Sequence, residues 1–437
     1  MNTEILLDHE PVADGGYLVR ALLRVSGQAP EAEDRPPLNL SVVLDRSGSM
    51  RSMGKLDRAK EAASLLVRRL GDGDVTSVVA YDDDVRTVAG RTAGAQRQEL
   101  LNRIDMIQTG GMTNLSGGWL RGRELVAEAL VDGGVNRVLL LTDGLANVGI
   151  TEPGQLRDLI GSAAAKGVST TTIGFGADYD EQLLRSLAQA GGGSTYYIEE
   201  PDQAPAVFEA EIEGLMALAA QNVTVTVSPS SSVEHAAVLH QYPRQQTDDG
   251  SLRLELGDLY ALEPRSLLCE FLLTSDDGAA EADVATLTSE GYVLLPNGGV
   301  EKKRVKLPIR VQRSGAAVVN PEVRRELLLL EAARAREAAL EDRAYGAFED
   351  GARKLRTIAE KMAPHAASDD EVRDEVEDLR DLAEKFDEEQ VSVKDAKWMY
   401  QRAYSSAQSK RAMSERLVAD RAIERKKRSG GPQASDD

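Results

Sequence analysis

The sequence predicts an α/β domain with a doubly wound, mostly parallel sheet, inserted in an antiparallel β-sandwich and followed by a C-terminal α-helical region. Three observations support this fold class. Apolar strand patterns alternate with helical patterns in the first half of the chain, as in parallel sheets covered by helices. Short β-rich runs separated by Pro, Gly and Asp then favour an antiparallel sandwich. The last part is rich in Ala, Glu, Arg and Leu, which are common in helices.

The chain of 437 residues is longer than one hydrophobic core usually supports, so several domains are expected. The expected parts are N-terminal sandwich strands at 1–36, the α/β domain at 37–220, the remainder of the sandwich at 221–313, a helical domain at 314–428 and a disordered tail at 429–437. Strands at 4–7 and 17–25 would be marginally stable as a pair. We therefore expect them to complete the later sandwich.

Strands and helices alternate in the predicted α/β domain. The strands are expected at 40–44, 75–81, 137–142 and 169–175, and the helices at 55–70, 96–107, 119–131, 153–166 and 180–190. In the first helix, for example, apolar residues recur at helical spacing from Leu56 to Leu70. The segment "GGGSTYY" is expected to lead into an edge strand, since no Lys follows at phosphate-loop spacing.

Helices are also expected at 321–362, 369–388 and 392–427. Two roles remain open for this C-terminal region. It can form an amphipathic bundle packed on its own chain, or an arm that binds a partner or dimerises.

Composition restricts the partners. The formal charge of −20 disfavours nucleic acid and anionic membrane surfaces, because phosphate binding requires clustered Lys and Arg. The single cysteine, Cys269, rules out an internal disulfide or a thiolate metal site and is expected to be buried. The N-terminus has no secretory-signal pattern and no apolar run approaches a membrane span, so we expect a cytoplasmic protein without membrane insertion.

The stretch "LDRSGSM" carries the main chemical signal. It follows an apolar strand and places Asp45, Ser47 and Ser49 at every second position. By itself it can be a polar turn, a nucleophile or part of a metal site. Hard oxygen donors suit Mg²⁺, but six ligands require more residues at neighbouring strand ends. Thr113, in the glycine-rich "TGGMTNLSGG", and Asp143, at the end of "RVLLLTDG", are the expected additional donors.

These five residues, in this order, resemble the metal-ion-dependent adhesion site of von Willebrand factor type A (VWA) domains. "DRSGS", "GGMTNL" and "LLLTDG" fill all five positions of the motif. The resemblance implies that the hydroxyls of Ser47, Ser49 and Thr113 bind the cation, directly or through water, and that Asp45 and Asp143 balance its charge. The expected cofactor is Mg²⁺, with Mn²⁺ or Ca²⁺ as alternatives.

The resemblance further implies a protein-binding role, in which one coordination position accepts an Asp or Glu side chain of a partner protein. The layout is similar to prokaryotic cytoplasmic proteins with an inserted VWA domain, and in architecture to the heavy-chain family of trypsin inhibitors. An alternative is a VWA subunit that works with a separate AAA-type ATPase in a chelatase-like or assembly complex. Self-association through the C-terminal helices is a further alternative for the partner.

Catalysis is not expected. A phosphatase or mutase with Asp45 as nucleophile would need a second acid two residues later, where this chain has Ser47. A serine hydrolase would need a nucleophile elbow and a histidine base, and neither pattern is present. The four histidines, His9, His235, His240 and His365, are too scattered in sequence for a metal or triad signature.

Two further acidic clusters follow predicted strands. Asp82, Asp83 and Asp84 lack the glycine and distal Glu of a calcium-binding EF-hand loop, so a solvated hairpin turn is expected. "GFGADYDEQLL" places Gly174, Gly176, Asp178 and Asp180 at another strand end. We expect a turn followed by a helix cap there, with a rim contact to a partner as the alternative.

Overall fold

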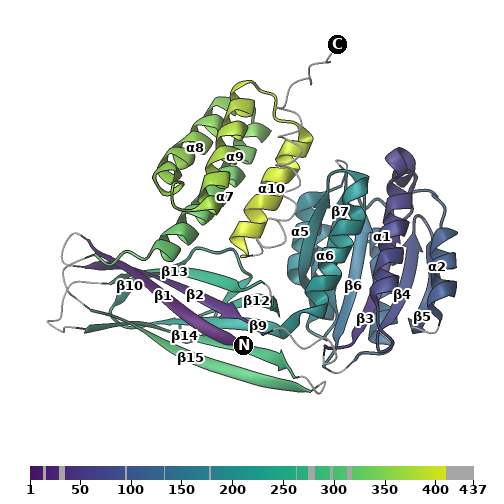
Figure 1. The fold of residues 1–437 in the computed structure, drawn as a ribbon, viewed down its shortest axis with the longest axis horizontal. Helices are drawn as coiled ribbons and strands as arrows, with labels where there is room; N and C mark the ends of the chain where they lie inside the picture. The colour runs from purple at the N-terminus through teal and green to yellow at the C-terminus, as the bar shows by residue number, and fades with distance from the viewer. Residues whose placement is uncertain are drawn as a thin grey trace, which may run out of the picture.

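The computed structural model describes residues 1–409, except 13–15, 29–34, 94–95, 132, 177–178, 262, 274–280, 296–298 and 313–316. The expected tail at 429–437 and the end of the last expected helix therefore lie outside the described residues. Figure 1 shows three parts: an α/β unit on the right, antiparallel sheets at the lower left, and helices standing above these sheets.

The α/β unit is built on a six-stranded sheet with the order β5-β4-β3-β6-β7-β8. The strands are β3 (Leu38–Asp45), β4 (Val75–Tyr81), β5 (Val85–Ala93), β6 (Val135–Thr142), β7 (Ser169–Phe175) and β8 (Gly192–Ile198). All neighbouring pairs are parallel except β4 and β5. The predicted mostly parallel sheet is confirmed, with β8 as the expected edge strand.

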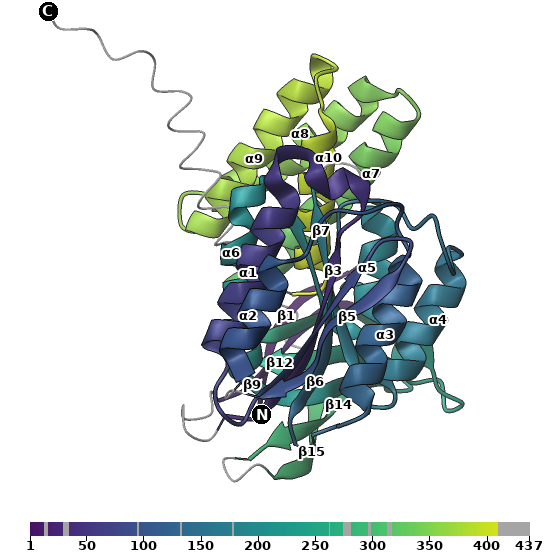
Figure 2. The ribbon, with the colours of Figure 1, turned by 90° about the vertical axis from the view of Figure 1, so that its right-hand side faces the viewer.

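Helices cover both faces of this sheet (Figure 2). α1 (Lys55–Arg69), α2 (Arg97–Asp105) and α6 (Ala204–Met216) pack on one face, and α3 (Leu115–Ala127), α4 (Pro153–Ala164) and α5 (Glu181–Ala190) on the other. α3 approaches the sheet closely, because a Cβ on Gly122 would lie 2.4 Å from Val43 Cγ2. The doubly wound arrangement therefore has a separate apolar core on each side of the sheet.

Several elements differ from the predictions. β5 and α6 were not among the expected elements, and a short 3₁₀ segment, η2 (Gly48–Gly54), precedes α1. The third helix begins at Leu115 instead of 119 because Asn114 caps it, accepting a hydrogen bond from the backbone N–H of Gly117. β5 gives no apolar signal because most of its residues are exposed or half-buried.

The antiparallel part consists of two sheets that share one core. One sheet has the order β1-β2-β13-β10 and the other β11-β12-β9-β14-β15. Their strands are β1 (Asn2–Pro11), β2 (Tyr17–Ser26), β9 (Leu218–Pro229), β10 (Val233–Val238), β11 (Arg244–Gln246), β12 (Leu252–Tyr260), β13 (Arg265–Leu273), β14 (Glu281–Leu294) and β15 (Val300–Gln312). β2 pairs with β13, so the N-terminal strands join strands that follow the α/β unit. Cys269 on β13 is buried, as expected, and burial raises its thiol pKa to about 12.

In the described residues that follow, there are four α-helices: α7 (Pro321–Ala344), α8 (Phe348–Met362), α9 (Asp370–Asp387) and α10 (Val393–Ala407). The expected helical stretch at 321–362 is interrupted at Gly346, which has a φ of +74°. α7 packs on the β1-β2-β13-β10 sheet through an apolar cluster formed by Leu22, Leu239, Leu268, Val323, Leu327 and Leu330. From α10, Lys397 donates to the Tyr179 carbonyl and to Glu181 in the α/β unit. These contacts support a bundle packed on its own chain.

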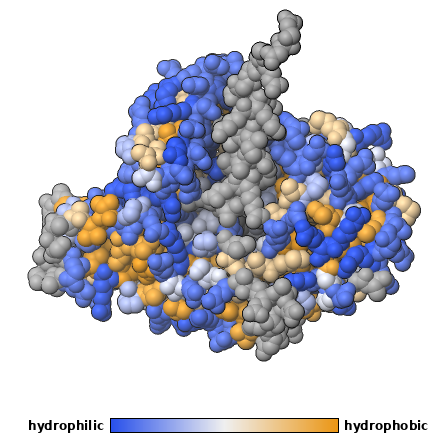
Figure 3. Space-filling model, in the orientation of Figure 1, coloured by the Kyte–Doolittle hydropathy of each residue, from blue (hydrophilic) through white to orange (hydrophobic). Residues whose placement is uncertain are grey.

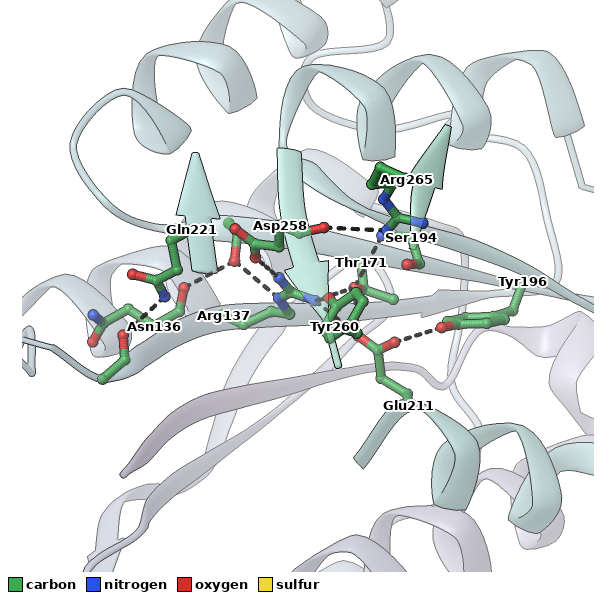
Figure 4. Close-up of polar contacts among 12 residues, drawn as sticks. Asn136, Arg137, Thr171, Ser194, Tyr196, Glu211, Gln221, Asp258, Tyr260 and Arg265 are labelled. Atoms are coloured by element: carbon green, nitrogen blue, oxygen red, sulfur yellow. Dashed lines mark hydrogen bonds and ion pairs between the residues drawn. The ribbon is translucent and has the colours of Figure 1, made fainter. Parts of the chain in front are cut away.

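A buried arginine joins the α/β unit to the antiparallel sheets. Arg137 on β6 is fully buried and points toward Asp258 and Tyr260 of β12 and Glu211 of α6 (Figure 4). Its guanidinium lies 2.7 Å from the Tyr260 hydroxyl and 3.2 Å from Glu211, and it pairs with Asp258. Burial lowers the pKa of Arg137, but these partners outweigh burial and raise its pKa, so it stays charged. This network fixes the N-terminal end of β6 against β12.

The face in Figure 3 is mostly hydrophilic over the helices, and hydrophobic side chains gather over the strands labelled β10, β1 and β2 in Figure 1. None of the helices in the described part of the chain has the length and hydropathy needed to cross a bilayer.

Candidate metal centre

The candidate donors come from three loops at one end of the six-stranded sheet. Asp45 ends β3, Ser47 and Ser49 follow it, Thr113 precedes α3, and Asp143 follows β6. β3 and β6 are adjacent and parallel, so their carboxyl ends meet. This is the edge at which doubly wound sheets bind ligands. The Arg137 network lies near the opposite end of β6, about 20 Å away at roughly 3.3 Å per strand residue.

Asp45 is completely buried and held by its own chain. Its Oδ1 accepts a hydrogen bond of 2.8 Å from the Ser47 backbone N–H, and its Oδ2 accepts one of 2.6 Å from the Thr142 hydroxyl. Burial raises the Asp45 pKa to about 6, although these hydrogen bonds oppose the shift. A nearby cation favours the ionised form of a buried carboxyl group over its protonated form.

The three hydroxyls and Asp143 lie close together. The Oγ atoms of Ser47 and Ser49 are 3.1 Å apart, and the Ser49 hydroxyl donates to Asp143 Oδ1 at 2.6 Å. A Cβ placed on Gly144 would lie 3.6 Å from Thr113 Oγ1 and 3.7 Å from Ser49 Oγ, so these two hydroxyls flank the same point. Asp143 is fully buried, whereas Ser49 is exposed. The five predicted residues therefore form one group that opens to solvent at Ser49.

The glycine-rich loop before Thr113 is held against the acidic turn after β4. Gly111 N donates to Asp82 Oδ2 at 3.0 Å, and a Cβ on Gly110 would lie 1.7 Å from the same oxygen. Asp82 also pairs with Arg46 at 2.5 Å. The expectation of a solvated turn is wrong for Asp82, which is only 5% exposed. Its carboxylate is buried between the glycine-rich loop and Arg46. Only Asp83 and Asp84 are exposed.

Lys55 belongs to the same group and was not among the predicted site residues. It is 2% exposed, and its Nζ lies 2.7 Å from Asp143 Oδ2. The sequence offered only a weak signal, a lysine at the first position of the predicted helix. Because 88 residues separate the two partners, spacing in the sequence does not reveal the pair.

The residue types present fit a small hard cation. The donors are hydroxyl and carboxylate oxygens, which Mg²⁺ prefers, and no thiol or imidazole is among them. In the part of the chain that the structure describes, there is no cluster of three or more His, Cys, Asp or Glu residues suited to a metal. The candidate centre differs from such clusters by having two carboxylates and three hydroxyls.

Other predicted polar positions lie away from these five residues or have structural roles. Asp180 caps α5 by accepting a hydrogen bond from Leu183 N, as expected, whereas Asp178 lies outside the described residues. His240 is buried beside Glu326 of α7, with 3.0 Å between Nε2 and Oε1. The contact between His240 and Glu326 is therefore part of the packing of α7.

The family model described as the von Willebrand factor type A domain matches residues 39–210. The chain contains a VWA domain. The matched residues begin in β3 and end in α6, and they include the six-stranded sheet except Leu38, and all five candidate donors. The VWA domain is therefore the α/β unit, and its fold agrees with the resemblance found in the sequence.

Two solved structures share the fold along most of the chain. A von Willebrand factor type A protein from Catenulispora acidiphila has a TM-score of 0.66 at 17% identity, and the match covers 87% of this chain and 89% of that one. The ArnB paralog VWA2 from Sulfolobus acidocaldarius has a TM-score of 0.54 at 17% identity and covers 94% and 97%. At this identity, both show the fold alone.

Curated relatives match in sequence over shorter regions. YfbK from Escherichia coli, named as an uncharacterized protein, is 27% identical over 268 residues, which are 60% of this chain and 47% of the relative. Human inter-alpha-trypsin inhibitor heavy chain H3 is 28% identical over 184 residues, 40% of this chain and 21% of the relative. The chain thus spans about half the length of YfbK and a smaller part of the heavy chain.

Proposed function

We propose that the VWA domain is a metal-dependent protein-interaction module, in which a divalent cation held by Asp45, Ser47, Ser49, Thr113 and Asp143 captures an acidic side chain of a partner protein. The observation that carries this proposal is the convergence of these five oxygen-bearing side chains at one sheet edge, with Ser49 exposed. Mg²⁺ is the cation that we propose, with Mn²⁺ or Ca²⁺ as alternatives.

The chain's own contacts suggest separate roles for the carboxylates and the hydroxyls. Both oxygens of Asp45 accept hydrogen bonds, and Asp143 is shared between Ser49 and Lys55. These carboxylates are positioned to balance positive charge from the buried side, and the hydroxyls to act as neutral donors. A bound divalent cation would supply a positive position for an incoming anionic oxygen. With few carboxylates bound to it directly, it would stay electrophilic.

The same geometry supports a non-catalytic role for this site. A nucleophilic carboxylate needs an accessible oxygen, whereas Asp45 is 0% exposed and both its oxygens are engaged. We propose binding without catalysis for this site. The sequence matches to heavy chain H3 and YfbK support a VWA-based role but name no partner for this chain. Residence in the cytoplasm, as in prokaryotic proteins of this type, is part of the same proposal.

Immobilised full-length protein tests the proposal by capture from an extract with MgCl₂ or with EDTA. Captured proteins are identified and then prepared in pure form. We expect a pure partner to bind wild type in Mg²⁺, to dissociate on chelation, and to fail to bind Asp45→Ala. Restoring Mg²⁺ should restore binding, whereas replacing the partner's contacting Asp or Glu by amide should abolish it. Binding unaffected by chelation and by Asp45→Ala would contradict the proposal. If the captured partner is an ATPase, the assembly-complex alternative is favoured.

A further inference from the structure

Three exposed apolar residues lie within four positions of a candidate donor in the sequence. Met53 is 70% exposed, Met112 is 55% exposed and Leu145 is 57% exposed. Each lies in a different donor loop: Met53 follows Ser49 by four residues, Met112 precedes Thr113, and Leu145 follows Asp143 by two residues. Scattered exposed apolar residues are ordinary, but one in each donor loop is a pattern that needs a reason.

Hydrogen bonds hold these loops together. Gly48 N donates to the Gly111 carbonyl at 2.8 Å, which joins the first loop to the second. Asn147 N donates to the Thr113 carbonyl at 3.2 Å, which joins the third loop to the second. Gly144, the neighbour of Leu145, lies against the hydroxyls of Ser49 and Thr113. The three apolar residues are therefore carried on one connected frame around the donors.

The backbone conformation of Met53 is a second unusual feature of this exposed apolar residue. Met53 has φ 52° and ψ 22°, a left-handed conformation that is unfavourable for residues other than glycine. The next residue, Gly54, has a φ of +68°. Glycine would adopt the conformation at position 53 more easily, yet the chain places a long apolar side chain there and exposes it to solvent.

The charge around this surface indicates what it binds. Arg51 is exposed between Ser49 and Met53, and its Nη2 lies 3.3 Å from Thr109 Oγ1. Asp83 is also exposed, and it accepts a hydrogen bond from the Met112 backbone N–H, so it places a negative charge on that side of the surface. The positive position that would attract an acidic segment is therefore the bound cation together with Arg51. A second copy of this chain is an unsuitable occupant because each copy carries a formal charge of −20. The complementary surface is a short acidic segment with apolar neighbours.

We propose that Met53, Met112 and Leu145 form an apolar rim that selects a partner segment whose metal-binding Asp or Glu is flanked by large apolar side chains. This inference rests on the proposed function and adds the chemistry of the partner. The carboxylate gives attachment, and burial of its apolar neighbours gives selectivity. Methionine suits such a rim because its flexible thioether side chain adapts to different apolar shapes.

Two capped heptapeptides of equal charge test the rim. Their central residues are Leu-Asp-Leu in one and Ser-Asp-Ser in the other, with Gly and Ser flanks, and a third peptide carries Asn in place of Asp. Calorimetry with full-length protein in MgCl₂ gives the affinities. The methyl signals of ¹³C-labelled methionine, assigned with Met53→Gly and Met112→Ser, report contact. We expect the Leu-Asp-Leu peptide to bind at least about tenfold more tightly than the Ser-Asp-Ser peptide and to shift the signals of both methionines.

The variants separate a binding role from a folding role. Met53→Gly removes the side chain and relieves the left-handed strain, so its Tm should be unchanged or higher and its Mg²⁺ affinity unchanged. Its preference for the apolar peptide over the Ser-Asp-Ser peptide should fall about three- to tenfold. We expect the same fall in preference for Met112→Ser and for Leu145→Ser. Leu130→Ser is the control, because Leu130 is 46% exposed but follows α3 in the same domain, away from the donor loops.

Either of two peptide results would overturn the proposed rim: equal binding of the two Asp peptides, or binding of neither, by protein that has bound Mg²⁺. Mg²⁺-dependent self-association in sedimentation velocity would also contradict it, since the occupant would then be a second copy. Failure of wild type to bind Mg²⁺ at all would instead refute the proposed function itself, so the two failures are distinguishable.

Discussion

At the residue scale, the candidate centre depends on pairs of side chains that the chain brings together from distant positions. The spacing of Asp45, Ser47 and Ser49 could be read from the sequence because all three lie in one loop. Thr113 and Asp143 could be added because strand ends of a parallel sheet share an edge. Their convergence is observed, and their binding of a cation stays a prediction. Lys55 could not be predicted, because its partner depends on how α1 is set against β6.

Lys55→Met tests the role of the lysine. The change removes a positive charge beside Asp143, so Mg²⁺ affinity should rise roughly tenfold, since nearby unit charges interact by ~1–4 kcal/mol. Without metal, the unpaired buried carboxylate should lower the free energy of unfolding by about 3 kcal/mol. Calorimetry and thermal denaturation with and without Mg²⁺ measure both effects.

Lys60→Met is the matched control on the same helix, because Lys60 lies 3.3 Å from Asp57 and donates to the Asp105 carbonyl instead of to a candidate donor. It should change Mg²⁺ affinity little. Weaker Mg²⁺ binding by Lys55→Met would show that the lysine supports the cation instead of competing with it.

At the element scale, apolar patterns located the buried strands better than they located exposed elements. β3 and β6 are buried along their whole length, and the sequence showed both as apolar runs. β5 was missed because its exposed residues carry no apolar alternation. The start of α3 was missed because its cap depends on a side-chain hydrogen bond from Gly117 to Asn114, which hydropathy does not report. Boundaries set by single contacts are therefore the least predictable part of the fold.

Gly122→Ala tests the close packing of α3 on the central sheet. The added methyl group would meet Val43 Cγ2 at 2.4 Å and Ser41 Oγ at 3.0 Å, both in β3. We expect a loss of about 1–3 kcal/mol in the free energy of unfolding, as for other overpacked cores. Urea denaturation followed by circular dichroism measures this loss.

The control is Gly161→Ala in α4, where the nearest atom to the added Cβ is 3.9 Å away. Alanine in an open helix position should stabilise the protein by about 0.5–1 kcal/mol. A Gly122→Ala variant as stable as wild type would show that α3 lies farther from the sheet than in this structure.

At the scale of the whole molecule, the VWA domain is joined to the rest of the chain near both ends of its sheet, the Arg137 end and the end that carries the candidate metal centre. Arg137 and its partners fix one end of β6 to β12, and α10 contacts α5 through Lys397 and Glu181. The sequence predicted the order of the parts, and the pairing of β2 with β13 follows the expected completion of the sandwich by N-terminal strands. It could not predict Arg137, which looked like any charged residue at the start of an apolar strand.

Arg137→Met tests whether this network holds the domains together. Methionine fills similar space but leaves Asp258 and Glu211 without their cation, so the free energy of unfolding should fall by about 3–5 kcal/mol. Limited proteolysis should also cut more rapidly between the VWA domain and the antiparallel sheets. Arg157→Met is the control, because the Arg157 side chain is 57% exposed and its loss should change stability by less than about 0.5 kcal/mol. Equal stability of the two variants would refute the bridging role of Arg137.

The central claim is that five side chains from three loops form one cation site, and titration of Mg²⁺ into metal-free protein by calorimetry tests it most directly. We expect one cation per chain for wild type, no saturable binding for Asp45→Ala, and roughly tenfold weaker binding for Thr113→Ala. Thr109→Ala, which removes a hydroxyl from the same loop that contacts Arg51 instead of the donors, should bind as wild type does. Thr113→Ala with wild-type affinity, or wild type without saturable binding, would contradict the account.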